Sequence, residues 1–181
     1  MRAIVAAITE GQLSAEARLV IGNNAGAPAL AFAREQGVPV RHISATSAGG
    51  EDAADAAICA AFAEHGCDWI ILSGYLRKLG PQTLRQFEGR ILNIHPALLP
   101  KYGGQGMFGR HVHEAVLAAG ETTSGATVHF VDGEYDHGAI VAQREVPVLP
   151  GDTVDSLQAR VMAMEPAFFV DVLKMIAARD A

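Results

Sequence analysis

Short apolar runs alternate with helical segments along the chain. The apolar run in 67–74 is nearly continuous, which is typical of a strand buried on both faces. The segment 51–66 opens with acidic residues, which suit the positive end of a helix dipole. The pattern predicts strands at 16–24, 38–44, 67–74, 90–95, 124–132 and 139–148, and helices at 2–10, 27–37, 51–66, 81–89, 109–120 and 152–180.

This alternation predicts an α/β fold in a single domain, 1–181, with a mostly parallel twisted sheet, helices on both faces and a C-terminal helical region. We expect Gly37 to end the second helix. Asp152 or Thr153 should cap the last one, and Pro166 should break or kink it.

A polar pair stands at the end of the run 90–95. Asn93 and His95 are its polar members, and Pro96 and Pro100 stiffen the chain that follows. Ligands of open α/β sheets bind beyond the carboxyl ends of the strands. Asn93 and His95 are therefore candidate site residues, although a single histidine at a strand end can equally serve only to satisfy loop carbonyls.

Composition narrows the class of protein. Of the 181 residues 50% are hydrophobic and 19% are charged, as in a globular chain with a sizeable core. The net charge of -6, without any block of Lys and Arg, argues against nucleic acid as the main partner. Neither a membrane-spanning run nor a signal-peptide pattern occurs. We interpret Cys59 and Cys67 as free thiols of a reducing cytoplasm, and expect neither a disulfide scaffold nor a thiolate metal site.

Several motifs resemble those of the folate-dependent formyltransferases, and they follow the family's order from about Arg2 to the C-terminus. LNIHPALLPKYGG at 92–104 resembles the family's signature, and ILSGYLRKL at 71–79 resembles its strand and folate loop. The segment 124–153 resembles a second signature, with Asp136 at the catalytic position. The segment 159–169 is similar to the closing helix, whose glutamate falls on Glu165. The resemblance implies a Rossmann-like formyltransferase fold.

The resemblance also implies a reaction. The formyl group of 10-formyltetrahydrofolate, the co-substrate, would pass to the amine of glycinamide ribonucleotide in purine biosynthesis, without a metal. Asn93 would stabilise the oxyanion, His95 would transfer protons near neutral pH, and Asp136 would orient the imidazole and favour its protonated form. We expect a cytoplasmic monomer or homodimer that acts on small molecules, without nucleic-acid or membrane partners.

Further positions follow from the same resemblance. It implies nucleotide contacts from Glu165 and His111, and folate contacts from Leu76, Arg77, Lys78, Leu79, Asn93, Val131 and Tyr135. Without the resemblance, the sequence pattern would indicate only a solvated turn at Arg77 and Lys78 and a surface acid at Glu165. His111 and His113 stand two residues apart on a helix, so they point to different sides and are poorly placed to share a metal. His129 has a supporting role only.

Two departures from the family pattern stand out. The glycine-rich segment 103–109 is longer than in some members, and we interpret it as a mobile lid. The family's first strand and phosphate loop precede the helix at which Met1 falls, so the resemblance implies an N-terminally incomplete domain. If the chain begins at Met1, we expect the sheet to be split or repaired by another segment, and glycinamide ribonucleotide to bind weakly.

Three alternatives stay open. A tRNA formyltransferase would share the signature but normally carries a further C-terminal domain and a basic surface. A formyltetrahydrofolate hydrolase would usually carry an extra N-terminal domain. A folate-binding remnant would bind the co-substrate without transferring its formyl group.

Overall fold

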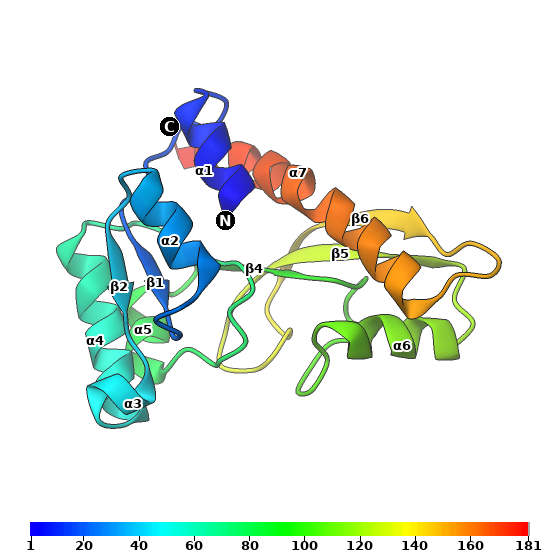
Figure 1. Cartoon of the computed structure of the whole chain (residues 1–181), viewed down its shortest axis with the longest axis horizontal. Helices are drawn as coiled ribbons and strands as arrows, with labels where there is room; N and C mark the ends of the chain where they lie inside the picture. Colours follow the sequence, from blue (N-terminus) through cyan, green and yellow to red (C-terminus); the bar gives the residue numbers. More distant parts are fainter. Residues whose placement is uncertain (181) are drawn as a thin grey trace. The chain divides into compact units, whose positions relative to one another are not determined.

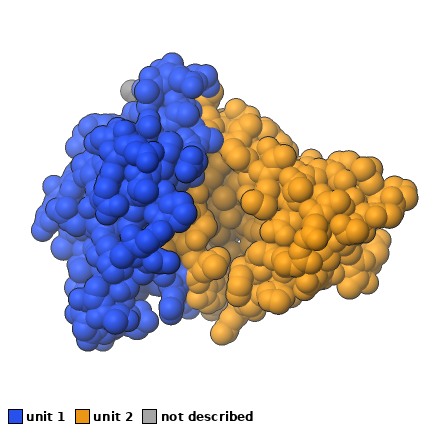
Figure 2. All heavy atoms as spheres, in the orientation of Figure 1, with its two compact units in different colours: residues 1–70, 77–91 blue, residues 71–76, 92–181 orange. Residues whose placement is uncertain are grey.

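The structure is a computed structural model that describes residues 1–180. It divides into two compact units, which Figure 2 colours separately. Unit 1 comprises Met1–Ile70 and Arg77–Ile91, and unit 2 comprises Ile71–Leu76 and the chain from Leu92 onward. Figure 1 labels most of the helices and strands of both.

Unit 1 is mostly helical and contains one small parallel sheet. β1 (Val20–Gly22) pairs with β2 (Val40–His42), with Val20 opposite Val40. A parallel pair needs a crossover connection, and α2 supplies it. Ile43, Ala54, Ile58 and Ala61 form a buried cluster between the end of β2 and α4. The helices of this unit are α1 (Arg2–Thr9), α2 (Pro28–Glu35), α3 (Ala45–Ala48), α4 (Glu51–Glu64) and α5 (Pro81–Gln86).

A second sheet has the strand order β3-β4-β5-β6. Its strands are β3 (Ile70–Leu72), β4 (Ile91–His95), β5 (Thr123–Phe130) and β6 (Ile140–Pro147). β5 is antiparallel to both β4 and β6. In unit 2, α7 (Val154–Asp180) packs against β5, β6 and α6 (Arg110–Ala118). The core of this unit contains three side chains that are fully excluded from solvent, Leu92, Val128 and Val161.

The α/β class, with its C-terminal helix, is confirmed, but the sheet is less parallel than the alternation predicts. β5 and β6 are joined by 131–139, a connection without a helix, and such a short link forms a hairpin rather than a parallel crossover. The strands are also shorter than the apolar runs: the run 16–24 yields only Val20–Gly22. The short helix α3 was not predicted; Ser44 and Ser47 close a reciprocal capping box at its start.

The helix ends follow the predicted signals, with one exception. Gly37 has φ +72° directly after α2, which confirms it as a stop. Thr153 caps α7, because its hydroxyl accepts the Ser156 N–H at 3.2 Å while the Ser156 hydroxyl accepts the Thr153 N–H at 2.9 Å. Of the predicted break or kink at Pro166, the break is wrong, since α7 continues through this residue. Burial of the neighbouring Phe168 and Phe169 offsets the missing hydrogen bond.

The strands form two sheets, one of β1 and β2 and one of β3 to β6. The single-domain prediction for 1–181 and the loss of a phosphate loop stay predictions. Within residues 1–180, the helices are too short or too polar for any of them to cross a bilayer.

Candidate functional site

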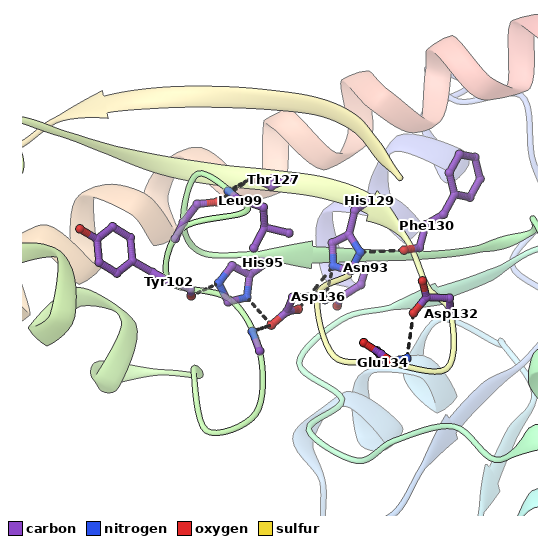
Figure 3. A network of polar contacts seen from close by, with 12 residues as sticks. Asn93, His95, Leu99, Tyr102, Thr127, His129, Phe130, Asp132, Glu134 and Asp136 are labelled. Carbon is purple, nitrogen blue, oxygen red and sulfur yellow. Dashed lines mark hydrogen bonds and ion pairs between the residues drawn. The ribbon is translucent and has the colours of Figure 1, made fainter. Parts of the chain in front are cut away.

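The end of β4 and the facing part of β5 bring four polar side chains to one face of the sheet. Asn93 lies opposite His129, and His95 lies opposite Thr127. Residues two apart on a strand share a face, and directly opposed residues of an antiparallel pair share it too. Asp136, from the connection between β5 and β6, completes the group in unit 2 (Figure 3).

His95 is held between two hydrogen-bond acceptors. Its Nδ1 lies 3.3 Å from Asp136 Oδ2, and its Nε2 lies 2.7 Å from the carbonyl oxygen of Tyr102. Only a doubly protonated ring can donate to both. Burial nevertheless lowers the pKa of His95, against the raising effects of the Asp136 charge and the Tyr102 carbonyl. The ring therefore gives up its proton more readily than an exposed histidine, although both neighbouring oxygens accept hydrogen bonds from its N–H groups when it is protonated.

Asp136 has an unusual backbone and a strongly hydrogen-bonded side chain. Its φ is +54°, a left-handed value that Asp tolerates better than most residues. Its Oδ2 accepts the Gly104 N–H at 3.0 Å, and its Oδ1 lies 3.5 Å from His129 Nε2. Burial raises the pKa of Asp136, but His129, the charge of His95 and the Gly104 N–H outweigh it, so the pKa is lowered and the group is a carboxylate.

His129 fixes the amide of Asn93. The Nδ1 atom of His129 lies 2.7 Å from the Phe130 carbonyl oxygen, so it carries the ring proton. In a neutral ring, Nε2 accepts an N–H from Asn93 Nδ2 at 3.2 Å, whereas in a protonated ring it donates to Asp136 Oδ1. One N–H of the Asn93 amide remains for another partner. Sequence reasoning gave His129 only a supporting role, since its place opposite Asn93 depends on a strand register that the sequence does not show.

Thr127 fastens the proline-rich exit from β4. Its hydroxyl donates to the Ala97 carbonyl at 2.6 Å and accepts the Leu99 N–H at 3.0 Å and the Gln143 amide at 2.9 Å. The Gln143 amide also donates to the Leu99 carbonyl at 2.8 Å. Gly103 follows in the same segment, and a Cβ there would lie 2.5 Å from Leu99 Cδ2. The backbone around His95 is thus preorganised, as the two prolines suggested.

Comparison with known proteins identifies the family. Residues 1–173 match the family model described as formyl transferase. The chain belongs to the formyl transferase family. A match over nearly the whole chain agrees with the motifs at 71–79, 92–104 and 124–153, and with the α/β fold that carries them.

Individual formyl transferases are similar over almost the full chain. The chain is 37% identical to the chloroplastic phosphoribosylglycinamide formyltransferase of Vigna unguiculata, over 97% of this chain and 56% of that protein. It thus spans about half the length of this curated relative. It is 34% identical to the Escherichia coli phosphoribosylglycinamide formyltransferase, over 98% of this chain and 81% of that one. The glycinamide ribonucleotide transformylase 1 structure of Symbiobacterium toebii superimposes with a TM-score of 0.90 at 35% identity, over 98% and 81% of the two chains.

In this formyl transferase the structure brings Asn93, His95 and Asp136 together, joined through His129. His111 lies apart: it is exposed, lies 3.4 Å from Glu114 and rests edge-on against Phe108.

Glu165 is half-buried on α7, where burial raises the pKa of its carboxyl. Among the hydrogen bonds and ion pairs of residues 1–180, none joins Glu165 or His111 to the His95 network. A role for either residue at the nucleotide stays a prediction.

The expected folate loop is largely exposed. Leu76 is 64% exposed and Arg77 and Lys78 are exposed, whereas Leu79 is buried. Val131 and Tyr135 lie in the same connection as Asp136. Within residues 1–180, no three His, Cys, Asp or Glu side chains are grouped to hold a metal.

Proposed function

We propose that this formyl transferase passes the formyl group of 10-formyltetrahydrofolate to the amine of glycinamide ribonucleotide. The observation that carries the proposal is the buried His95–Asp136 pair, 3.3 Å apart, with Asn93 on the same strand face. The names of the relatives that match over most of their own length support this substrate pair.

The first step needs stabilisation of a negative charge. The substrate amine attacks the formyl carbon, and charge develops on the formyl oxygen. The N–H of Asn93 that His129 leaves unused would bind that oxygen. A donor held in place before the reaction costs no reorganisation at the moment of charge development, and β4 together with His129 provides such a donor.

The second step needs a proton to move. The tetrahedral intermediate loses a proton from the attacking nitrogen, and the departing folate nitrogen gains one. Asp136, a carboxylate with a lowered pKa, would help to orient His95 and stabilise it when protonated. His95, whose pKa burial lowers, would release the proton again. A water molecule between the two nitrogens would complete the transfer.

The substrate contacts belong to the same proposal. Folate would be bound by Leu76, Arg77, Lys78, Leu79, Asn93, Val131 and Tyr135, and the nucleotide by Glu165 and His111. A cytoplasmic location suits the free thiols Cys59 and Cys67, and a monomer or homodimer completes the proposal.

One assay separates this function from its alternatives. The purified chain is mixed with 10-formyltetrahydrofolate, and the absorbance of the folate product is followed with glycinamide ribonucleotide, with methionyl-tRNA and with neither. Binding of the folate is measured separately by titration. Product formation that requires the nucleotide supports the proposal. Equal product without it indicates a hydrolase, and product only with methionyl-tRNA indicates a tRNA formyltransferase. Folate binding without product in any mixture would indicate the remnant.

A further inference from the structure

A buried aspartate on one helix caps another helix in unit 1. The side chain of Asp55, on α4, is 5% exposed. Its Oδ2 accepts the Gln82 N–H at 2.7 Å, and its Oδ1 accepts the Thr83 N–H at 3.1 Å and the Thr83 hydroxyl at 2.6 Å. These are the second and third residues of α5, whose N–H groups have no partner within the helix.

The segment before α5 is shaped to admit this carboxylate. Gly80 precedes the helix and has no side chain to cap it, while Pro81 at the first position has no N–H. A Cβ at Gly80 would lie 2.3 Å from Asp55 Cγ, so a larger residue would displace the carboxylate. Asp55 therefore does from α4 what an N-cap residue ordinarily does from its own helix.

The same contacts fix the segment just before α5. Leu79 is buried at 7% exposure next to the capped turn, whereas Arg77 and Lys78 are exposed. With Gly80 held against Asp55 and Leu79 in the core, the position of the backbone at 77–79 depends on the start of α5. The proposed reaction uses this segment to contact folate.

We infer that Asp55 is a positioning residue for the folate-binding segment, although it lies in a different helix and contributes no contact to the ligand itself. The inference rests on the proposed function for its choice of ligand. A purely structural cap would predict a different outcome: its loss would weaken the fold and impair binding of both substrates alike.

Limited digestion with trypsin tests the positioning without any substrate, because trypsin cleaves after Arg77 and Lys78. Asp55→Asn keeps the size of the side chain but replaces one acceptor oxygen with a donor. We expect it to raise the cleavage rate at these two bonds roughly tenfold, since cleavage follows the population of the open segment. Cleavage after Arg110, in unit 2, should not change. Asp52→Asn, an exposed position in the same helix, is the matched control.

Kinetics test the link to folate. In Asp55→Asn the KM for 10-formyltetrahydrofolate should rise roughly tenfold, while kcat and the KM for glycinamide ribonucleotide stay within about twofold of the parent. Thr83→Val, which replaces the hydroxyl with a methyl group and keeps the backbone N–H, should give a smaller change in the same direction. This variant serves if Asp55→Asn fails to fold. Parental cleavage rates at 77 and 78, or equal changes in both KM values, would overturn the inference. If the parent chain shows no formyl transfer, the proposed function is contradicted, whereas the trypsin experiment still tests whether Asp55 positions the segment 77–79.

Discussion

The amide nitrogen of Asn93 lies 3.2 Å from Nε2 of His129. The same Nε2 lies 3.5 Å from Asp136 Oδ1. A neutral His129 accepts a hydrogen bond from Asn93, whereas a protonated His129 would donate to Asp136 and force the Asn93 amide to turn. The protonation state of His129 therefore decides which way the proposed oxyanion donor points.

A double-mutant cycle tests that coupling. Asn93→Ala should lower kcat by about 10²–10³-fold through the lost donor. His129→Ala should lower it by a smaller factor, because the amide is then free to turn. If His129 acts through Asn93, adding His129→Ala to Asn93→Ala should cost little more. Fully multiplicative losses, with circular dichroism showing that all three variants are folded, would contradict the coupling.

Loss of either partner of the His95–Asp136 pair should impair turnover. We expect His95→Ala and Asp136→Asn each to lower kcat by about 10²–10⁴-fold, the usual worth of general acid–base help. Asp171→Asn is the matched control for the second variant, since Asp171 is exposed on α7 and pairs with Arg144. Near-parental turnover in His95→Ala would rule out the proton-transfer role.

The pH–rate profile should move when Asp136 is neutralised. Asp136 raises the pKa of His95 against the larger lowering effect of burial, and His129 also lowers it. Asp136→Asn removes the raising contribution, so the acid limb of the profile should shift to lower pH in the remaining activity. The neighbouring His113 and the Tyr102 carbonyl are unchanged in the variant. An acid limb at the parental pH would exclude Asp136 from this titration.

Stability should also depend on pH through a second buried histidine. His113 is 1% exposed on α6, and its Nδ1 has no hydrogen-bond partner among residues 1–180. Burial and the charge of His95 lower the pKa of His113. As the pH falls below 6.5, the ordinary pKa of histidine, the imidazole of His113 is protonated in the unfolded chain while it is still neutral in the native chain. The free energy of unfolding should therefore fall as the pH drops through this window.

Urea titrations at a series of pH values would measure that dependence. His113→Asn should flatten the slope below about pH 6.5, although a contribution from His95 remains. His111→Asn, an exposed position on the same helix, should keep the parental slope. A slope in His113→Asn as steep as that of the parent would show that His113 does not titrate on unfolding.

Some of this site could be read from the sequence and some could not. Alternation along β4 puts Asn93 and His95 at a strand end and on one face, and two prolines mark a rigid exit. Asp136 could be found only through the resemblance to the family. It lies in a loop, where no helix or strand periodicity indicates which side chain faces the site. The contact between His95 and the Tyr102 carbonyl depends on a backbone with φ +57° at Tyr102, which no side-chain pattern specifies.

The fold shows the same division. Most helices and their ends follow local signals such as Thr153 and Gly37, which the sequence shows. The short helix α3 and the continuation of α7 through Pro166 are the exceptions. Strand direction depends on where the chain turns back, and the lack of a helix in 131–139 is the one local sign of the antiparallel pair. The cap that Asp55 provides for α5 joins residues 28 positions apart, so it requires the packed structure.

The left-handed backbone at Asp136 restricts which residues a mutational scan would recover there. Two requirements meet at this position, a carboxylate for the neighbouring histidines and a conformation in which bulky or β-branched residues are strained. Selection for stability alone should enrich Gly and Asn, which accept the backbone and discard the charge. Selection for the proposed reaction should return Asp almost alone, because Glu keeps the charge but moves it by one methylene. The difference between the two enrichment profiles would separate conformational constraint from chemical constraint at a single codon.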